Sequence, residues 1–250
     1  MNIYNNLIIK KKHQNCVLAI GNFDGVHLGH QKVIKQAKEK ARKSKLPIGL
    51  LTFEPMPVIF FNKKIKNHRI NSLKQKVEQL KKLNLNFLVI IKFDRKFSHY
   101  SPEKFIKKIL FDKIRSKHIF VSKNFKFGKD RKGNIFTLKK FQKQFGFKTV
   151  ITSPYKISKK IISSTIIRKK ILSGKIKEAN KLLNRHWSIE GKVVKGSKRG
   201  RKIGFPTCNI KIKDYVIPRL GVYSVFVKTN TLKKKGIANI GYRPTFNGQN

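Results

Sequence analysis

The chain has 250 residues, 39% of them hydrophobic, and its 60 Lys and Arg against 11 Asp and Glu give a formal net charge of +49. This length and apolar content predict a globular protein with one large or two modest domains. The sequence has no run of the ~18 apolar residues that a membrane span needs and no apolar segment of a signal peptide after Met1, which argues against a membrane protein. Its two cysteines, Cys16 and Cys208, are far apart, so we expect free thiols in the cytoplasm.

The strong positive charge has two interpretations. A field of this sign attracts polyanions, so a nucleic-acid-binding protein is one hypothesis. However, the lysines are spread along the whole chain, and Ile and Asn are abundant too, which is typical of A/T-rich codons. We therefore attribute the charge mainly to mutational bias, with non-specific polyanion binding as a side effect.

The first predicted elements are an edge strand around Ile8 and a strand, turn and helix that follow it. Val17 to Ile20 form an apolar run typical of a buried strand, and from Gln31 to Ala41 apolar residues recur at helical spacing. Glycines allow a ligand to approach the backbone closely, and the N–H groups that open a helix bind anions. The turn favours a phosphate site because it combines glycines and histidines: Gly21, Gly25, His27, Gly29 and His30.

Strands and helices alternate along the next part of the chain. Two prolines in Glu54–Pro57 predict a loop after the second strand. Helices are predicted from Ser72 to Leu83 and from Ile176 to Leu183. Another helix is predicted to begin at Ser101, and a separate one is predicted to follow Arg168 and end at Leu172. This alternation predicts a parallel sheet covered on both faces. The further strands are predicted at Ile48–Phe53, Phe87–Ile91, His118–Val121 and Thr149–Ile151.

The pattern changes from Trp187 onwards. Short apolar runs alternate with turns, and no helical spacing separates them. This pattern predicts an antiparallel β-domain at residues 185–250, after an α/β domain at residues 1–184. The strands are predicted within Ile189–Gly196, Cys208–Ile212, Gly221–Val227 and Gly236–Ile240.

Four motifs in this sequence resemble those of one enzyme family. They are Gly21-Asn-Phe-Asp-Gly-Val-His27-Leu-Gly-His30, Asn124-Phe-Lys-Phe127-Gly128, Ser163-Ser-Thr165-Ile-Ile-Arg168 and Gly200-Arg-Lys-Ile-Gly-Phe-Pro-Thr207-Cys-Asn209. The first resembles the HxGH signature of the nucleotidyltransferase superfamily, in the form carried by prokaryotic bifunctional riboflavin kinase/FAD synthetases. The others resemble the flavin-nucleotide loop, the Ser-Ser-Thr-x-Ile-Arg motif and the riboflavin kinase signature of the same family.

The resemblance implies a fold and a reaction. The implied fold is α/β, a Rossmann-like nucleotidyltransferase domain with a parallel sheet, followed by an incomplete antiparallel β-barrel that is riboflavin-kinase-like. The implied reaction is adenylyl transfer from ATP to FMN, which makes FAD and releases pyrophosphate with the help of Mg²⁺. Riboflavin is the implied substrate of the kinase module.

The resemblance also implies roles for particular residues. The implied catalytic residues, which stabilise charge on the reacting phosphates, are His27, His30 and Arg168. The implied ATP-binding residues are Gly21, Phe23, Asp24, Gly29, Ser163, Ser164 and Thr165. The implied flavin-binding residues are Asn124, Phe125 and Phe127, and the implied Mg²⁺ and ATP ligands of the kinase module are Thr207 and Asn209.

The sequence departs from the family pattern at several places, one of which is Ser122, where a Gly is common. Met56 stands where the family usually has His, and Ile166 stands where Arg is frequent. The kinase module lacks the Glu that is implied as the base for the riboflavin hydroxyl, since the only acids after residue 185 are Glu190 and Asp214. We therefore expect a C-terminally truncated kinase module whose activity is lost or impaired.

Two other functions stay open at this point. A nucleotidyltransferase for another phosphorylated substrate would share the histidine turn, but it would not be expected to carry the kinase-like segment Gly204–Thr207. A nucleic-acid-binding protein would use the charge without needing the motifs. It predicts salt-sensitive binding of DNA or RNA and no release of pyrophosphate.

Overall fold

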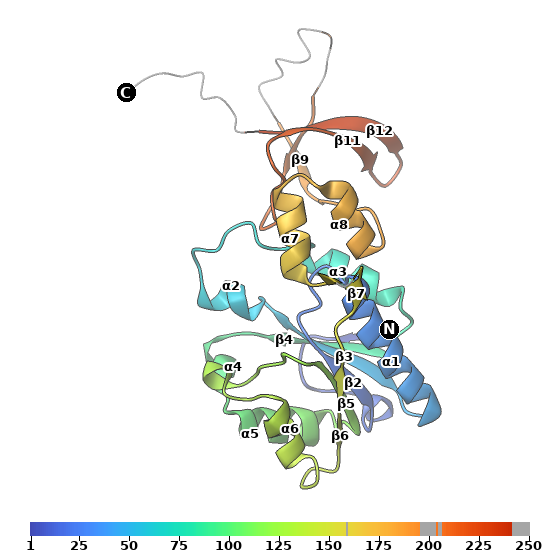
Figure 1. Ribbon diagram of the computed structural model, residues 1–250, viewed down its shortest axis with the longest axis vertical. Coiled ribbons are helices and arrows are strands. Elements are labelled where there is room, and N and C mark those ends of the chain that lie inside the picture. The colour runs from blue at the N-terminus through green and yellow to red at the C-terminus, as the bar shows by residue number, and fades with distance from the viewer. Residues whose placement is uncertain (159, 196–203, 205–206, 242–250) are drawn as a thin grey trace.

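A sheet of six parallel strands, in the order β1-β4-β3-β2-β5-β6, forms the centre of the N-terminal domain (Figure 1). The computed structural model describes residues 1–158, 160–195, 204 and 207–241. The chain passes from β2 to β3 and β4 on one side, and then crosses to β5 and β6 on the other side of β2. The strands are β1 (Asn2–Tyr4), β2 (Val17–Ile20), β3 (Ile48–Glu54), β4 (Phe87–Lys92), β5 (His118–Ser122) and β6 (Lys148–Thr152).

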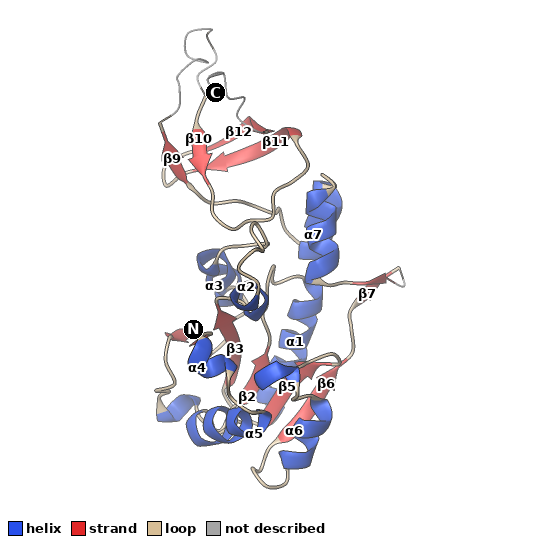
Figure 2. Ribbon diagram, turned by 90° about the vertical axis from the view of Figure 1, so that its left-hand side faces the viewer, coloured by secondary structure: helices blue, strands red, loops and turns tan. Residues whose placement is uncertain are grey.

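Helices cover both faces of this sheet (Figure 2). Helices α1 and α3 pack on one face, and α5, the π-helix η2 and α6 pack on the other. Helices α7 and α8 lie between the sheet and the C-terminal strands (Figure 1). The helices are η1 (Lys11–His13), α1 (Leu28–Lys43), α2 (Pro57–Phe61), α3 (Leu73–Lys81), α4 (Arg95–Ser98), α5 (Pro102–Phe105), η2 (Ile106–Lys113), η3 (Lys129–Arg131), α6 (Ile135–Phe141), α7 (Ser164–Leu172) and α8 (Ile176–Leu183).

Alternation along β2 decides which side chains meet each layer of helices. Successive side chains of a strand point to opposite faces of the sheet. Val17 and Ala19 therefore pack with α1 and α3, whereas Leu18 and Ile20 pack with α5 and η2. All of them are buried, which confirms the prediction of a buried strand and explains why this run is continuously apolar. Within the part of the chain that the structure describes, no helix is long and apolar enough to cross a membrane.

Serine caps fix the beginnings of two helices where the sequence predicts them. The Ser72 hydroxyl accepts the N–H of Gln75, and the Gln75 side chain accepts the N–H of Ser72, so α3 begins with a capping box. The Ser101 hydroxyl accepts the N–H of Lys104 at the start of α5. Each cap satisfies N–H groups that a helix leaves without partners.

Several predicted boundaries are wrong, each for a local reason. The edge strand is β1, whereas Ile8 lies outside it and is exposed. Strand β1 has few apolar residues to reveal it in the sequence, since it pairs only with β4 at the edge of the sheet. The proline segment after β3 opens helix α2, since Pro57 occupies the first turn, where no N–H is needed. Helix α1 begins at Leu28 because His27 caps it. The sequence analysis also missed α4, α6 and the hairpin of β7 (Lys156–Ile157) and β8 (Lys160–Ile161).

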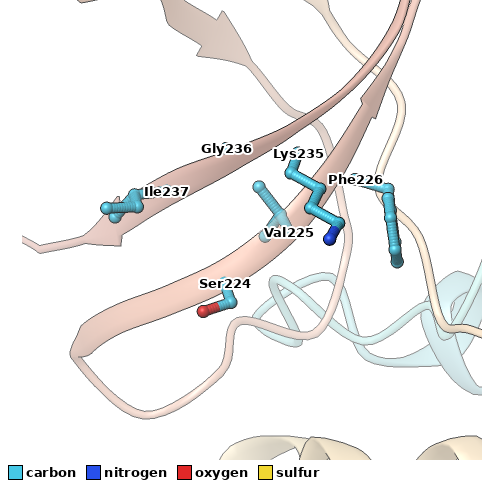
Figure 3. A pocket seen from close by; sticks show the side chains of 6 residues that line it. All are labelled: Ser224, Val225, Phe226, Lys235, Gly236 and Ile237. Atoms are coloured by element: carbon cyan, nitrogen blue, oxygen red, sulfur yellow. The ribbon is translucent and has the colours of Figure 1, made fainter.

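The C-terminal part contains antiparallel strands, as predicted. Within the described residues they form two separate pairs, β9 (Lys192–Val194) with β10 (Asn209–Lys211) and β11 (Gly221–Lys228) with β12 (Lys233–Ile240). A hollow on the β11–β12 hairpin is lined by Ser224, Val225, Phe226, Lys235, Gly236 and Ile237 (Figure 3).

The two parts of the chain share backbone hydrogen bonds. The N–H of Arg69 donates to the carbonyl of Asp214 at 2.7 Å, and the N–H of Val216 donates to the carbonyl of Arg69 at 2.8 Å. The buried Tyr215 between them donates its hydroxyl to Gln75 Oε1 at 2.9 Å, and the Gln75 amide donates to the carbonyl of Ser188 at 3.1 Å. The segment before α3 therefore pairs through its backbone with residues 214–216 of the C-terminal part.

We expect Tyr215→Phe to lower the free energy of unfolding by about 1 kcal/mol, because it removes a buried hydrogen bond to Gln75. Urea unfolding measures the change. Tyr223→Phe is the matched control, since the Tyr223 hydroxyl makes a solvent-exposed hydrogen bond to the carbonyl of Arg219. Equal losses in the two variants would show that the buried bond does not stabilise the junction.

Candidate active site

The turn that holds the two histidines lies at the carboxyl edge of the sheet, directly after β2. Strand β2 pairs with β3 on one side and with β5 on the other. From β2 the chain continues to β3 and β4 on the first side, and it later crosses to β5 and β6 on the second side, so the order of strands reverses at β2. In a parallel sheet, ligands bind in the crevice at such a switch point. The loop of residues 122–134 follows β5, so it belongs to the same edge as the histidine turn.

The backbone of this turn adopts an unusual conformation. Phe23 and Val26 have positive φ angles of 48° and 40°, and Gly25 has a φ of 84°. Such a conformation at residues other than glycine costs about 1–3 kcal/mol each, and it is concentrated at functional sites. The N–H of Gly25 donates to Asn71 Oδ1 at 2.7 Å, which holds the turn against the segment before α3.

His27 caps helix α1 through its own ring. Its Nδ1 accepts the N–H of Gly29 at 3.1 Å. A Cβ at position 29 would lie 3.0 Å from the His27 ring, so glycine gives the ring room to make this contact. Because Nδ1 accepts a hydrogen bond, the proton of the neutral ring lies on Nε2.

The rings of His27 and His30 are stacked, with centroids 3.7 Å apart and planes inclined by 22°. The ring of Phe23 meets His30 edge-on at 5.3 Å. Burial, together with the smaller effects of the Arg168 and Arg185 charges, lowers the pKa of His27 to about 4. Burial, followed by His27 and Lys76, also places the pKa of His30 well below its usual value. Both imidazoles are therefore neutral at pH 7.

Two nitrogens of this stack are buried without a hydrogen-bond partner among the residues that the structure describes. They are Nε2 of His27 and Nδ1 of His30. A buried polar atom without a partner costs about 1–3 kcal/mol. With the proton on Nε2, His27 can donate a hydrogen bond to an anion although its ring is neutral.

Asp24 connects the histidine turn to two distant segments. Its Oδ2 accepts from Nη2 of Arg168 at 2.6 Å, and its Oδ1 accepts the N–H of Ile70 at 3.2 Å. Its carbonyl accepts the hydroxyl of Ser164 at 2.9 Å. The Asp24 side chain is 3% exposed and that of Arg168 is 16% exposed, so this is a buried ion pair.

The segment at the start of α7 lies beside the turn, but its polar groups are largely engaged in holding the structure. The Ser163 hydroxyl accepts the N–H of Ile166 as a helix cap, and Ser164 donates to Asp24. Arg168 pairs with Asp24 and also donates Nε to the carbonyl of His68 at 2.8 Å. Thr165 is exposed. The structure thus brings these residues to the histidine turn, and it gives Ser164 and Arg168 a supporting contact that the sequence analysis did not foresee.

The loop after β5 presents its three candidate flavin residues differently. Phe127 is 7% exposed and packs against Phe105, so it anchors the loop in the core. Phe125 is half-buried and stacks on Phe127 at 5.4 Å, and Asn124 is exposed. Among the two aromatic side chains, Phe125 therefore has the accessible ring.

The sequence analysis missed several groups around the turn. Nη1 of Arg69 donates to Oε2 of Glu54 at 3.0 Å, and Nη2 of Arg185 donates to the carbonyl of Gly25 at 2.7 Å. The side chain of Lys76 is 1% exposed. A signal for Lys76 was present in the sequence, because it falls within the apolar spacing of α3, whereas the arginines come from distant segments.

The positions of the other candidate residues are simpler. Gly21 donates its N–H to the carbonyl of Leu51 and begins the turn. Met56, which stands in place of the family's His, is buried at 1% exposure. Asn209 is exposed as the first residue of β10, and Thr207 is exposed just before that strand. Residues 200–203 and 205–206 of the kinase-like motif lie outside the described residues.

A parallel sheet with a glycine and histidine turn at its switch point, followed by a small antiparallel β-domain, defines a nucleotidyltransferase-like α/β protein. The family model described as FAD synthetase matches residues 9–166, and the one described as riboflavin kinase matches residues 183–250. The chain therefore belongs to the bifunctional riboflavin kinase/FMN adenylyltransferase family.

Two relatives that carry the family's name support this assignment, and a solved structure described under another name is similar in fold. The chain is 41% identical to the bifunctional riboflavin kinase/FMN adenylyltransferase of Buchnera aphidicola from Schizaphis graminum, over 95% of this chain and 77% of the relative. It is 39% identical to the protein of the same name from Haemophilus influenzae, over 94% of this chain and 77% of the relative. A crystal structure described as a macrolide-efflux protein from Streptococcus pneumoniae has a TM-score of 0.83 at 31% identity, covering 98% of this chain and 80% of that chain.

The comparisons do not support the expected loss of kinase activity. The riboflavin kinase model matches residues 183–250, and the relatives carry the names of both activities. They also do not show the truncation of the kinase module that the sequence analysis expected.

We expect Asp24→Asn to lower the free energy of unfolding by about 3 kcal/mol, because it leaves the buried guanidinium of Arg168 without its counter-charge. Urea unfolding at neutral pH measures the change. Asp112→Asn is the control, since it breaks the exposed pair with Lys107, which should contribute about 0–1 kcal/mol. A loss in Asp24→Asn no larger than in Asp112→Asn would contradict the role given to Asp24.

Stability should also depend on pH through His27. In the unfolded chain His27 takes up a proton near its ordinary pKa of 6.5, whereas the folded ring does so only near 4. The free energy of unfolding is therefore unaffected by this group above pH 6.5, and it falls as the pH drops from 6.5 towards 4, by up to about 1.4 kcal/mol per pH unit.

Urea unfolding across this pH range tests the prediction with His27→Gln as the comparison. The variant should lose stability less steeply than the original protein as the pH falls. Parallel pH profiles would mean that His27 titrates normally in the folded chain.

Proposed function

We propose that the chain transfers the adenylyl group of ATP to FMN, which forms FAD and releases pyrophosphate. The observation that carries the proposal is the pair of unpartnered imidazole nitrogens, His27 Nε2 and His30 Nδ1, at the switch point of the sheet. The relatives, which are named for FMN adenylyl transfer and for riboflavin phosphorylation, support ATP and a flavin as the substrates.

The reaction joins two phosphates directly. An oxygen of the FMN phosphate forms a bond to the α-phosphorus of ATP, and the bond from that phosphorus to the oxygen bridging to the β-phosphate breaks. Negative charge then grows on the leaving pyrophosphate. The Nε2–H of neutral His27 donates to a phosphate oxygen, and because Gly29 already holds the Nδ1 side, little reorganisation is needed at that moment.

The neighbouring segments supply further contacts in this proposal. Thr165, which is exposed at the start of α7, binds the β- and γ-phosphates together with the N–H groups that open the helix. Arg168 contributes Nη1, which its contacts with Asp24 and His68 do not use. Asp24 and Ser164 keep the turn and α7 together, and they act on the phosphates through this geometry.

The loop after β5 binds the flavin in this proposal. The half-buried ring of Phe125 stacks on the flat isoalloxazine ring, and Asn124 offers hydrogen bonds to its polar edge. Phe127 supports Phe125 from below because it is anchored against Phe105.

Mg²⁺, when it is bound with ATP, neutralises charge on the departing phosphates. In the kinase module, Thr207 and Asn209 would hold a Mg²⁺ ion. Both are exposed, Thr207 just before β10 and Asn209 as its first residue, and oxygen ligands suit a Mg²⁺ ion that also binds phosphate oxygens. Among the described residues, no group of three or more His, Cys, Asp or Glu side chains is arranged to hold a metal ion.

We also propose the division of the chain at residues 184 and 185. Asn184 ends α8 in the left-handed conformation, with a φ of 55°, which stops the helix at this point. Residues 185–250 then form the kinase module, for which the relatives favour riboflavin phosphorylation over the loss of activity expected from the sequence. A cytoplasmic site of action, with Cys16 and Cys208 as free thiols, completes the proposal.

A paired chromatographic assay tests both activities. The purified protein is incubated with ATP and Mg²⁺, once with FMN and once with riboflavin, and FAD and FMN are followed. Formation of FAD from FMN supports the transferase, and formation of FMN from riboflavin supports the kinase. Failure to form FAD, together with tight and salt-sensitive binding of RNA or DNA, would favour a nucleic-acid-binding protein instead.

We expect His30→Ala to slow FAD formation by roughly 10²- to 10³-fold, the typical cost of losing a group that stabilises charge in the transition state. The same assay at saturating substrates measures the rate. His99→Ala, which changes an exposed histidine, should leave it nearly unchanged. Near-normal turnover in His30→Ala would remove the imidazole from the mechanism.

A further inference from the structure

A lysine lies on the buried face of helix α3. Leu73, Val77 and Leu80 of this face pack against the sheet and α1, and Lys76 lies within the same spacing. The Lys76 side chain is only 1% exposed. Lysine is almost never fully buried unless its charge has a partner.

No such partner is present among the described residues. Nζ of Lys76 is buried, and it makes no hydrogen bond and no ion pair. The nearby carboxylates, Asp24 and Glu54, are occupied by Arg168 and Arg69. A buried charge without a partner costs several kcal/mol, so this position needs a reason beyond packing.

The surroundings of Lys76 carry excess positive charge. Four cations lie around the turn, namely Arg69, Lys76, Arg168 and Arg185, against the two carboxylates Asp24 and Glu54. Arg69 and Arg168 are neutralised by these carboxylates, and Arg185 donates to backbone carbonyls. Lys76 alone among the four has neither kind of contact with the described residues.

Helix α3, which carries Lys76, packs beside the histidine turn. Phe23 and Val26 of the turn belong to the same buried cluster as Leu73 and Val77 of α3. In keeping with this packing, the charge of Lys76 is one of the causes that lower the pKa of His30, after burial and His27. Burial lowers the pKa of Lys76 itself, and the carboxylates of Asp24 and Glu54 oppose that shift. His27, His30 and Lys76 thus each bring a buried nitrogen without a described partner to neighbouring elements of the site, and a bound anion would satisfy such nitrogens.

We propose that the ammonium of Lys76 binds a phosphate oxygen of a nucleotide at the histidine pair. The inference rests on the proposed function and adds a cation to that site. Nζ is shielded from solvent, so binding requires neighbouring side chains to rearrange, and the flexible four-carbon stem of lysine allows the ammonium to follow the phosphate. The phosphate belongs either to ATP or to FMN, and the test below separates the two.

Initial rates of FAD formation measure the effect of Lys76→Met, which removes the charge and keeps a similar length. We expect the KM of one substrate to rise about 10- to 100-fold, as for the loss of a hydrogen bond to a charged group. A rise in the KM of ATP assigns the contact to ATP, and a rise in the KM of FMN assigns it to FMN. Lys74→Met is the matched control, because Lys74 is exposed on the same helix.

Thermal unfolding without substrates separates binding from a structural role. If Lys76 serves phosphate, Lys76→Met keeps or raises the melting temperature, because it removes an uncompensated buried charge. If Lys76 instead stabilises Asp24 and Glu54, the melting temperature falls and the KM values stay within about twofold of those of Lys74→Met, which would overturn the proposal.

A second measurement uses the original protein and stays decisive if Lys76→Met does not fold. The carbon-13 signal of the methylene next to the Lys76 ammonium is assigned by its loss in Lys76→Arg. It should shift when either α,β-methylene ATP with Mg²⁺ or FMN is added. No shift with either probe in a protein that makes FAD would overturn the role of Lys76 alone, whereas a protein that makes no FAD would overturn the proposed function as well.

Discussion

The buried carboxylate of Asp24 is the contact on which the arrangement of the site depends. It belongs to a turn with positive φ angles, and it binds the guanidinium of Arg168 and the N–H of Ile70. These partners come from helix α7 and from the segment before α3, and the hydrogen bonds from Ser164 to the Asp24 carbonyl and from Gly25 to Asn71 reinforce the same meeting at the end of β2. A charge at 3% exposure tolerates no loss of its partners, so the turn, the helix and the segment keep one relative position.

Burial then gives the histidines their chemical character. In water an imidazole near pH 7 is a mixture of charged and neutral forms, whereas the low pKa of His27 leaves one neutral form. Gly29 selects the tautomer by donating to Nδ1, and the Nε2 proton points to whatever binds there. In the proposed function, the neutral His27 therefore offers a hydrogen-bond donor to phosphate without adding to the positive charge of the surrounding arginines.

The sequence predicted the elements well where local patterns decide them. Val17–Ile20 reads as a buried strand because both of its faces are covered, and Ser72 reads as a cap because its partner Gln75 is three residues away. The contacts of Asp24 could not be predicted in this way, since Arg168 is 144 positions distant and any of many arginines could have been the partner. The sequence analysis did not single out Lys76, because the chain has 60 Lys and Arg residues and one more lysine on a helix does not stand out. Its spacing from Leu73 and Leu80 was the signal that places it on the buried face of α3.

The pairing of Arg69 with Tyr215 has a consequence for how the protein is made. Domains generally fold as units during synthesis, and the parallel sheet is complete once β6 has left the ribosome. The segment of residues 69–75, which contacts the histidine turn, still lacks two of its hydrogen-bond partners at that stage, because Tyr215 and Val216 are synthesised later. The N-terminal sheet can thus form early, while the histidine site reaches its final support only after the ribosome has passed residue 216.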